Sequence, residues 1–86
     1  MRYKISRHAQ EEMKRRGISL ASLESVLNNP QQVIPEKVGR KAYQSQVDFG
    51  SGKIFLLRAI VADNLDPAVV VTVYRTSKIK KCWGKQ

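Results

Sequence analysis

The chain has 86 residues and a mass of 9.8 kDa, so it has room for a single domain spanning residues 1–86. Its single cysteine, Cys82, excludes a disulfide within the chain and argues against a metal site built on cysteines. The apolar runs are far shorter than the roughly 18 residues needed to cross a bilayer, and the charged start does not resemble a signal peptide. We therefore expect a cytoplasmic protein with no membrane partner.

The charge balance is the most informative number. Sixteen Lys and Arg residues against seven Asp and Glu residues give a formal net charge of +9. Such an excess on a small body attracts polyanions, of which nucleic acid is the commonest in a cytoplasm. The last twelve residues hold no acid and carry Arg75, Lys78, Lys80, Lys81 and Lys85. This end of the chain is either a solubilising tail or, as we prefer because Tyr74, Ile79 and Trp83 stand among the charges, a surface that faces an anion.

The first quarter of the chain predicts a helix over residues 7–16. The alternating stretch before it, residues 2–5, is either a short edge strand or a lead-in. Ser6 is a typical N-cap, and Gly17 is a typical left-handed C-cap. One narrow apolar stripe, with a spacing of four residues, is formed by Ile5, Ala9 and Met13.

A second helix is predicted over residues 20–28. Ser19 is its expected N-cap, and Pro30 follows its end. Its apolar face is formed by Leu20, Leu23, Val26 and Leu27. Because the two predicted helices are joined by a very short link, we expect an αα-hairpin that covers a sheet.

The rest of the chain is β in character. Strands are expected at residues 33–34, confined to an edge or an end by Pro35, and at residues 41–49, 53–62 and 69–76. The connections at residues 50–52 and 64–67 are a hairpin loop and a turn, which make neighbouring strands antiparallel. The predicted class is therefore α+β in two layers, with an N-terminal helical hairpin packed on an antiparallel sheet of three or four strands.

Arg58 interrupts the apolar run of the predicted central strand. A charge at such a position either reaches the open face of the sheet or meets a buried acid. On the open face, beside Gln44, Gln46 and Tyr74, it forms part of a polar, basic floor opposite the helices. Tyr74 itself is either a proton relay or base-stacking residue, or a cross-strand packing residue. Because Tyr74 alternates with Arg75, the two side chains face opposite sides of a regular strand.

Few residues are suited to chemistry. The acids are scattered, no glycine-rich elbow surrounds a serine, and no phosphate-cradling glycine loop is present, so metal-dependent hydrolysis, nucleophilic catalysis by serine or cysteine, and nucleotide binding are all disfavoured. His8 is either a general acid or base or a surface residue packed beside Ile5 and Glu12. Arg75, Lys78 and Lys80 either balance the charge of a pentavalent phosphate or form a solvated basic edge. Trp83 either anchors the end of the chain or stacks on a base.

Four blocks of sequence are familiar. They are Ile5-Ser6-Arg7-His8-Ala9, Arg16-Gly17-Ile18, Asn29-Pro30 and Thr72-Val73-Tyr74-Arg75-Thr76-Ser77-Lys78. Together they resemble the bacterial family known as domain of unknown function 4258, whose length and element order are similar to those of RelE/ParE-type toxins. The resemblance implies a fold with helices before an antiparallel sheet, a toxin encoded beside a small antitoxin, and functional residues at His8, Tyr74, Arg75, Thr76 and Lys78.

The function expected from these observations is a toxin-like, metal-independent endoribonuclease that needs no cofactor. The expected catalytic residues are His8, Tyr74, Arg75 and Lys78, and the expected nucleic-acid contacts are Arg16, Arg58, Thr76, Lys80 and Lys81. Its partners are then RNA or the ribosome and a small acidic antitoxin. Two alternatives stay open, a non-catalytic nucleic-acid-binding module and a toxin that inhibits a protein such as a topoisomerase. The sequence also leaves open whether the chain is an enzyme and whether it forms a homodimer.

Overall fold

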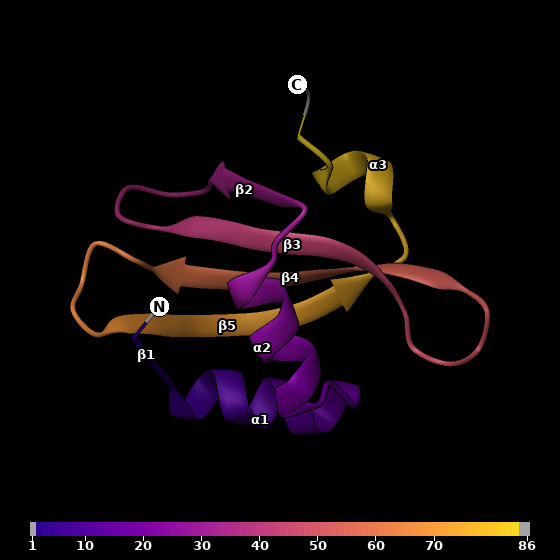
Figure 1. Cartoon of the computed structure of the whole chain (residues 1–86), viewed down its shortest axis with the longest axis horizontal. Helices are drawn as coiled ribbons and strands as arrows, with labels where there is room; N and C mark the ends of the chain where they lie inside the picture. Colours follow the sequence, from indigo (N-terminus) through magenta and orange to yellow (C-terminus); the bar gives the residue numbers. More distant parts are fainter. Residues whose placement is uncertain (1, 85–86) are drawn as a thin grey trace.

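The protein is built on one five-stranded sheet with helices on both of its faces (Figure 1). The computed structural model describes residues 2–84. Its elements in chain order are β1 (Tyr3–Ile5), α1 (Arg7–Arg16), α2 (Leu20–Asn28), β2 (Gln32–Pro35), β3 (Lys41–Asp48), β4 (Ile54–Ala62), β5 (Ala68–Thr76) and α3 (Ile79–Cys82). The α+β class predicted from the sequence is confirmed.

The sheet differs from the prediction in strand number and direction. Its order is β1-β5-β4-β3-β2, and the four strands from β2 to β5 are antiparallel neighbours as expected. The stretch at the start of the chain is a true edge strand, β1, which pairs in parallel with β5 through Tyr3–Ala68 and Ile5–Val70. The sheet therefore has five strands and is mixed, and the prediction of a purely antiparallel sheet of three or four strands is wrong.

The helix boundaries follow from local capping. The Ser6 hydroxyl accepts a hydrogen bond from the Ala9 amide, and Gly17 ends α1 in the left-handed conformation at φ 66°. Ser6 also fixes α1 to the sheet, since its hydroxyl donates to the carbonyl of Val71 at 2.9 Å. Ser19 caps α2 in the same way, by accepting from the amide of Ser22. All three predicted caps are confirmed, because each depends on residues within one helical turn.

Each of the first two helices packs on its own part of the sheet. α1 lies against β5, whereas α2 lies against β3 and β4, and the two helices contact the sheet more than each other. The expected hairpin is thus two separately supported helices. Together they cover the main core, whose buried members include Ala9, Met13, Leu23, Val26, Leu27, Leu57, Ala59, Val61, Val70 and Val73. Burial of this apolar surface is the main stabilising term in so small a domain.

The opposite face of the sheet is partly covered by residues 79–84, which we call the C-terminal segment. It begins with α3, a helix not predicted from the sequence, and the amide of Trp83 donates to the carbonyl of Ile79 at its end. Ala42 and Leu56 are fully buried on this second face. The end of the chain is therefore folded onto the body up to Gly84, and Lys85 lies outside the described residues. No helix among residues 2–84 is long and apolar enough to cross a membrane.

Candidate functional site

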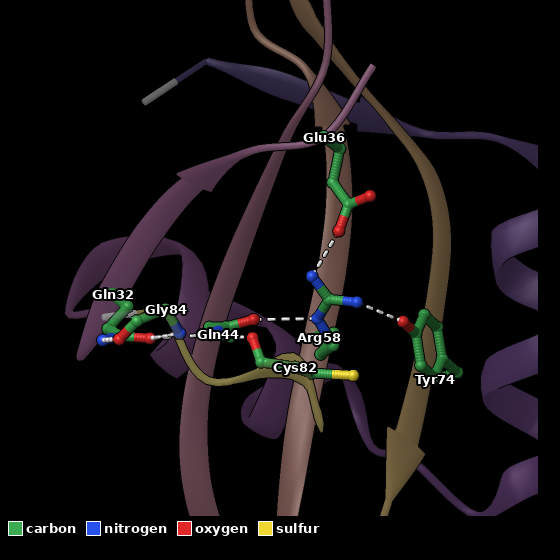
Figure 2. Close-up of polar contacts among 7 residues, drawn as sticks. All are labelled: Gln32, Glu36, Gln44, Arg58, Tyr74, Cys82 and Gly84. Atoms are coloured by element: carbon green, nitrogen blue, oxygen red, sulfur yellow. Dashed lines mark hydrogen bonds and ion pairs between the residues drawn. The ribbon is translucent and has the colours of Figure 1, made fainter. Parts of the chain in front are cut away.

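A row of polar side chains crosses four strands on the face opposite α1 and α2. Gln32 of β2 is the cross-strand partner of Gln44 in β3, Gln44 is the partner of Arg58 in β4, and Arg58 is the partner of Tyr74 in β5. Directly opposite residues point to the same face of a sheet, so the four side chains lie side by side. Figure 2 shows this row, with Glu36 reaching Arg58 from beyond the end of β2. We call Glu36, Gln44, Arg58 and Tyr74 the Arg58 site.

The guanidinium of Arg58 is the centre of this site. Its Nε donates to Oε1 of Gln44 at 2.8 Å, one terminal nitrogen donates to the hydroxyl of Tyr74, and the other donates to the carboxylate of Glu36. Arg58 is only 6% exposed. The expected position beside Gln44 and Tyr74 is confirmed. The acid that Arg58 meets, Glu36, is not buried, since its side chain is 32% exposed, so the alternative of a buried acid does not apply.

The electrostatics of the site favour a permanently charged Arg58. Burial lowers the pKa of the guanidinium, but its hydrogen bonds to Glu36 and Tyr74 outweigh burial and leave the pKa above its ordinary value. A buried arginine whose three nitrogen atoms all have partners is held in one orientation. The site therefore presents a fixed positive charge between a carboxylate and a phenol.

The C-terminal segment is bound to the same row of side chains. The Gln44 amide nitrogen donates to Oε1 of Gln32 at 2.8 Å and to the carbonyl of Cys82 at 3.2 Å. Gln32 in turn donates to the carbonyl of Gly84 at 2.9 Å and accepts from its amide at 3.0 Å. A side chain at position 84 would place its Cβ 2.9 Å from Ile34, so only glycine allows this approach without a shift. The end of the chain is thereby linked through Gln44 to Arg58.

Replacing Gln44 by leucine is expected to lower the free energy of unfolding by about 2 kcal/mol, because a buried amide that serves partners on both sides is lost. Gln44 is fully buried, and its removal leaves Nε of Arg58 and the carbonyl of Cys82 without their partner. Urea denaturation followed by circular dichroism measures this change. The matched control is Gln46→Leu, at an exposed position two residues further along β3. Equal effects of the two substitutions would contradict the structural role of Gln44.

The four residues predicted to be catalytic do not lie in one place. Tyr74 belongs to the Arg58 site, but His8 is exposed in the first turn of α1, on the other side of the sheet. The start of α1 is fixed to β5 by the bond from Ser6 to Val71. Arg75 is four residues further along β5 than Val71, so it lies about 13 Å from that point at the usual rise per residue. Lys78 is exposed just before α3. The structure therefore brings Tyr74 together with Arg58, and it places His8 apart from both.

Arg75 occupies an aromatic cluster on the helix-covered face. Its guanidinium carbon lies 4.7 Å from the ring centroid of Phe49 and 4.9 Å from that of Phe55. The two rings meet edge to face at 6.1 Å, and the ammonium of Lys53 lies 5.3 Å from the Phe55 ring. Tyr74 and Arg75 thus face opposite sides of β5, as their alternation predicts. The two rings stabilise the positive charge of Arg75 at this position through cation–π interactions.

The residues predicted to contact nucleic acid are spread over four elements, α1, β4, β5 and α3. Arg16, at the end of α1, forms an ion pair with Glu12 at 3.3 Å, and Thr76 at the end of β5 accepts from the amide of Lys78. Lys80 and Lys81 are exposed on α3. Arg58 already uses its donors within the site and is nearly covered. Lys80 and Lys81 on α3 are therefore the cations of this set that are exposed to a ligand.

Sequence reasoning missed two residues, Glu36 in the Arg58 site and Gln32, which bonds to Gln44 beside it. Glu36 follows Pro35 in what reads as a loop, and its partner Arg58 is 22 residues away. Gln32 was missed because the strand expected there includes only Val33 and Ile34, whereas β2 begins at Gln32. The available signal was the register itself, since aligning the three hairpins from β2 to β5 places Gln32, Gln44, Arg58 and Tyr74 in one row.

The arrangement can bind an anion and move a proton. Arg58 offers positive charge to a phosphate, the Glu36 carboxylate can accept a proton, and the Tyr74 hydroxyl can donate one. Within residues 2–84, no three His, Cys, Asp or Glu side chains gather as a metal-binding group. Cys82 has a free thiol, and it contributes its backbone carbonyl to the network.

Comparison with known proteins identifies the family. The model of the family described as Domain of unknown function (DUF4258) matches residues 5–75, and the chain belongs to this family. The matched range includes Glu36, Gln44, Arg58 and Tyr74 and ends before the C-terminal segment. Neither curated proteins nor solved structures gave a significant match.

Proposed function

We propose that the protein is a toxin-like, metal-independent endoribonuclease of a toxin–antitoxin pair, which cleaves RNA or ribosome-bound message at the Arg58 site. The observation that carries this proposal is the contact of one buried guanidinium with both a carboxylate and a phenol. These are the three kinds of group that phosphodiester cleavage needs when the nucleophile belongs to the RNA itself. An element order similar to that of RelE/ParE-type toxins, with two helices followed by antiparallel strands, adds support.

In the proposed reaction the 2′-hydroxyl of the RNA attacks the adjacent phosphorus. Glu36 takes the proton of the 2′-hydroxyl as the bond from O2′ to phosphorus forms. Arg58 balances the charge of the pentavalent phosphate. Tyr74 gives its proton to the 5′-oxygen as the bond from phosphorus to that oxygen breaks. The products are a 2′,3′-cyclic phosphate and a free 5′-hydroxyl, and a proton returned from Glu36 to Tyr74 restores the site.

The net charge of +9 supports RNA as the substrate. Exposed cations flank the open face at Lys78, Lys80 and Lys81. They can bind the backbone of a single strand on either side of the cleaved bond. The same cations suit the acidic segment of an antitoxin, which would then compete with RNA for this surface.

The first experiment is induction of the protein in a bacterial host, together with incubation of the purified protein with single-stranded RNA. We expect growth arrest and RNA fragments that end in a 2′,3′-cyclic phosphate, with cleavage unchanged by a chelator such as EDTA. The control is His8→Ala, which changes an exposed residue on the other side of the sheet and should leave cleavage intact. Cleavage that needs added magnesium, or that His8→Ala abolishes, contradicts the proposed mechanism.

The second candidate function is a non-catalytic RNA-binding module. The observation in its favour is that Arg58 is only 6% exposed and that its partners satisfy it completely, as expected of a structural network. This candidate predicts salt-dependent RNA binding without any cleavage product. The analysis of fragment ends above separates the two functions.

A further inference from the structure

A second basic feature lies at the turn between β2 and β3. This turn lies at the same end of the sheet as the turn that joins β4 to β5 (Figure 1). A hollow of about 420 Å³ is lined by residues of both turns. Three cations line it, Lys37, Arg40 and Lys41, together with Gly39, Asp63 and Asn64. We call this feature the turn hollow. None of its residues belongs to the Arg58 site.

The charge of the turn hollow is positive after internal pairing. Lys41 pairs with Asp63 at 3.2 Å, and the hydroxyl of Tyr43 also donates to Asp63, at 3.0 Å. Asp63 is therefore already neutralised. Within residues 2–84, neither Lys37 nor Arg40 forms an ion pair with a carboxylate, and both are exposed. Two positive charges thus remain for an outside anion.

The turn that carries these cations has a fixed shape. The amide of Glu36 donates to the carbonyl of Arg40 at 3.1 Å, and the amide of Arg40 donates to the carbonyl of Lys37 at 2.9 Å. Gly39 has φ 77°, and a Cβ there would lie 3.3 Å from Nδ2 of Asn64. The side-chain amide of Asn64, a hydrogen-bond donor, therefore lies close to the turn, where glycine leaves room for it.

We propose that the turn hollow binds a backbone phosphate of RNA next to the phosphate that reacts at the Arg58 site. The inference rests on the proposed function. The turn hollow is next to the Arg58 site because Glu36 and Lys37 are consecutive residues, whose Cα atoms are about 3.8 Å apart. In this proposal a strand that places one phosphate against Arg58 and Glu36 has a neighbouring phosphate within reach of Lys37 and Arg40 in the turn. The ligand is a phosphodiester, recognised by two cations and the amide of Asn64.

The test measures binding without cleavage. The probe is a single-stranded RNA with 2′-O-methyl riboses throughout, which lacks the attacking hydroxyl, and its dissociation constant is measured by fluorescence anisotropy over a range of salt concentrations. For the double variant Lys37→Gln/Arg40→Gln we expect roughly 10-fold weaker binding at 0.1 M salt and a slope against log salt smaller by about 0.7 to 1.4. The control is Lys4→Gln/Lys14→Gln, which removes the same charge from exposed positions in β1 and α1 and should keep the slope.

The outcomes separate this inference from the proposed function. Tight RNA binding with the same slope in the double variant and the wild type overturns the phosphate site alone. Absence of RNA binding by the wild type overturns both proposals. A titration with inorganic phosphate, followed through the amide NMR signals of residues 37–41, tests free phosphate as the ligand of the turn hollow. Saturable shifts of these signals in a protein that does not bind RNA would mark a site for free phosphate and refute the RNA assignment.

Discussion

Glu36→Gln is expected to slow RNA cleavage by about 100-fold or more while the protein stays folded. Glutamine keeps the oxygen that accepts the hydrogen bond from Arg58, but it cannot take up the proton of the attacking hydroxyl. Among the described residues, the Glu36 carboxylate is the one acid that pairs with Arg58. The measurement is the initial rate of cleavage of a defined oligoribonucleotide under single-turnover conditions.

The matched control for this substitution is Glu11→Gln, which removes an exposed carboxylate from α1 without touching the site. Tyr74→Phe is the companion variant, because it removes the hydroxyl and keeps the ring in the sheet. It should also slow cleavage strongly, since the leaving oxygen loses its proton donor. Thermal unfolding of each variant shows whether the fold is intact. A folded Glu36→Gln protein that cleaves at the rate of the wild type would refute the role of Glu36 as a base.

Arg58→Met is expected to lower the free energy of unfolding by about 3 kcal/mol. Methionine fills part of the space but donates no hydrogen bond, so Oε1 of the fully buried Gln44 loses its donor. Glu36 and Tyr74 lose theirs as well, at a smaller cost because the Glu36 side chain is 32% exposed and can be hydrated. A chain of 86 residues has a total stability of roughly 4–13 kcal/mol, so this loss is a large fraction of it.

Urea denaturation of the wild type, Arg58→Met and the control Arg7→Met measures this effect. Arg7 is exposed at the start of α1, and its replacement should change stability by less than about 0.5 kcal/mol. The double variant Arg58→Met/Glu36→Gln tests the pairing directly, because coupled residues give a combined loss smaller than the sum of the single losses. Because glutamine keeps the accepting oxygen, additive losses would show that the charge of Glu36 contributes nothing to holding Arg58.

The first two helices, α1 and α2, were predictable because their determinants are local. Ser6, Gly17 and Ser19 each act on residues within one turn, and the spacing of Ala9 and Met13 identifies the buried side of α1. The face of Arg58 was predictable for a similar reason, since alternation along β4 and its neighbours separates polar from apolar positions. These features depend on the order of residues, not on the path of the whole chain.

The parts that sequence reasoning missed depend on distant contacts. β1 has only three residues, and nothing within them reveals that their partner is β5, with Ser6 and Val71 joined across 65 residues. Glu36 contacts Arg58 because the turn after β2 places its side chain against the sheet. No local sequence pattern indicates this contact. α3 is one turn long, and its segment is held in place by the side chains of Gln32 and Gln44 rather than by its own helical propensity. Tertiary contacts therefore determine the positions of β1, Glu36 and α3.

The parallel pairing of β1 with β5 has a consequence for how the protein is made. α1 rests on β5, and β1 extends the sheet beyond it, so the first sixteen residues have no surface to pack on until the ribosome has synthesised residues 68–76. Folding therefore cannot proceed from the N-terminus in step with synthesis. Contacts between such distant segments also slow the search for the native state. β1 and α1 are therefore expected to stay unfolded until residues 68–76 have left the ribosome.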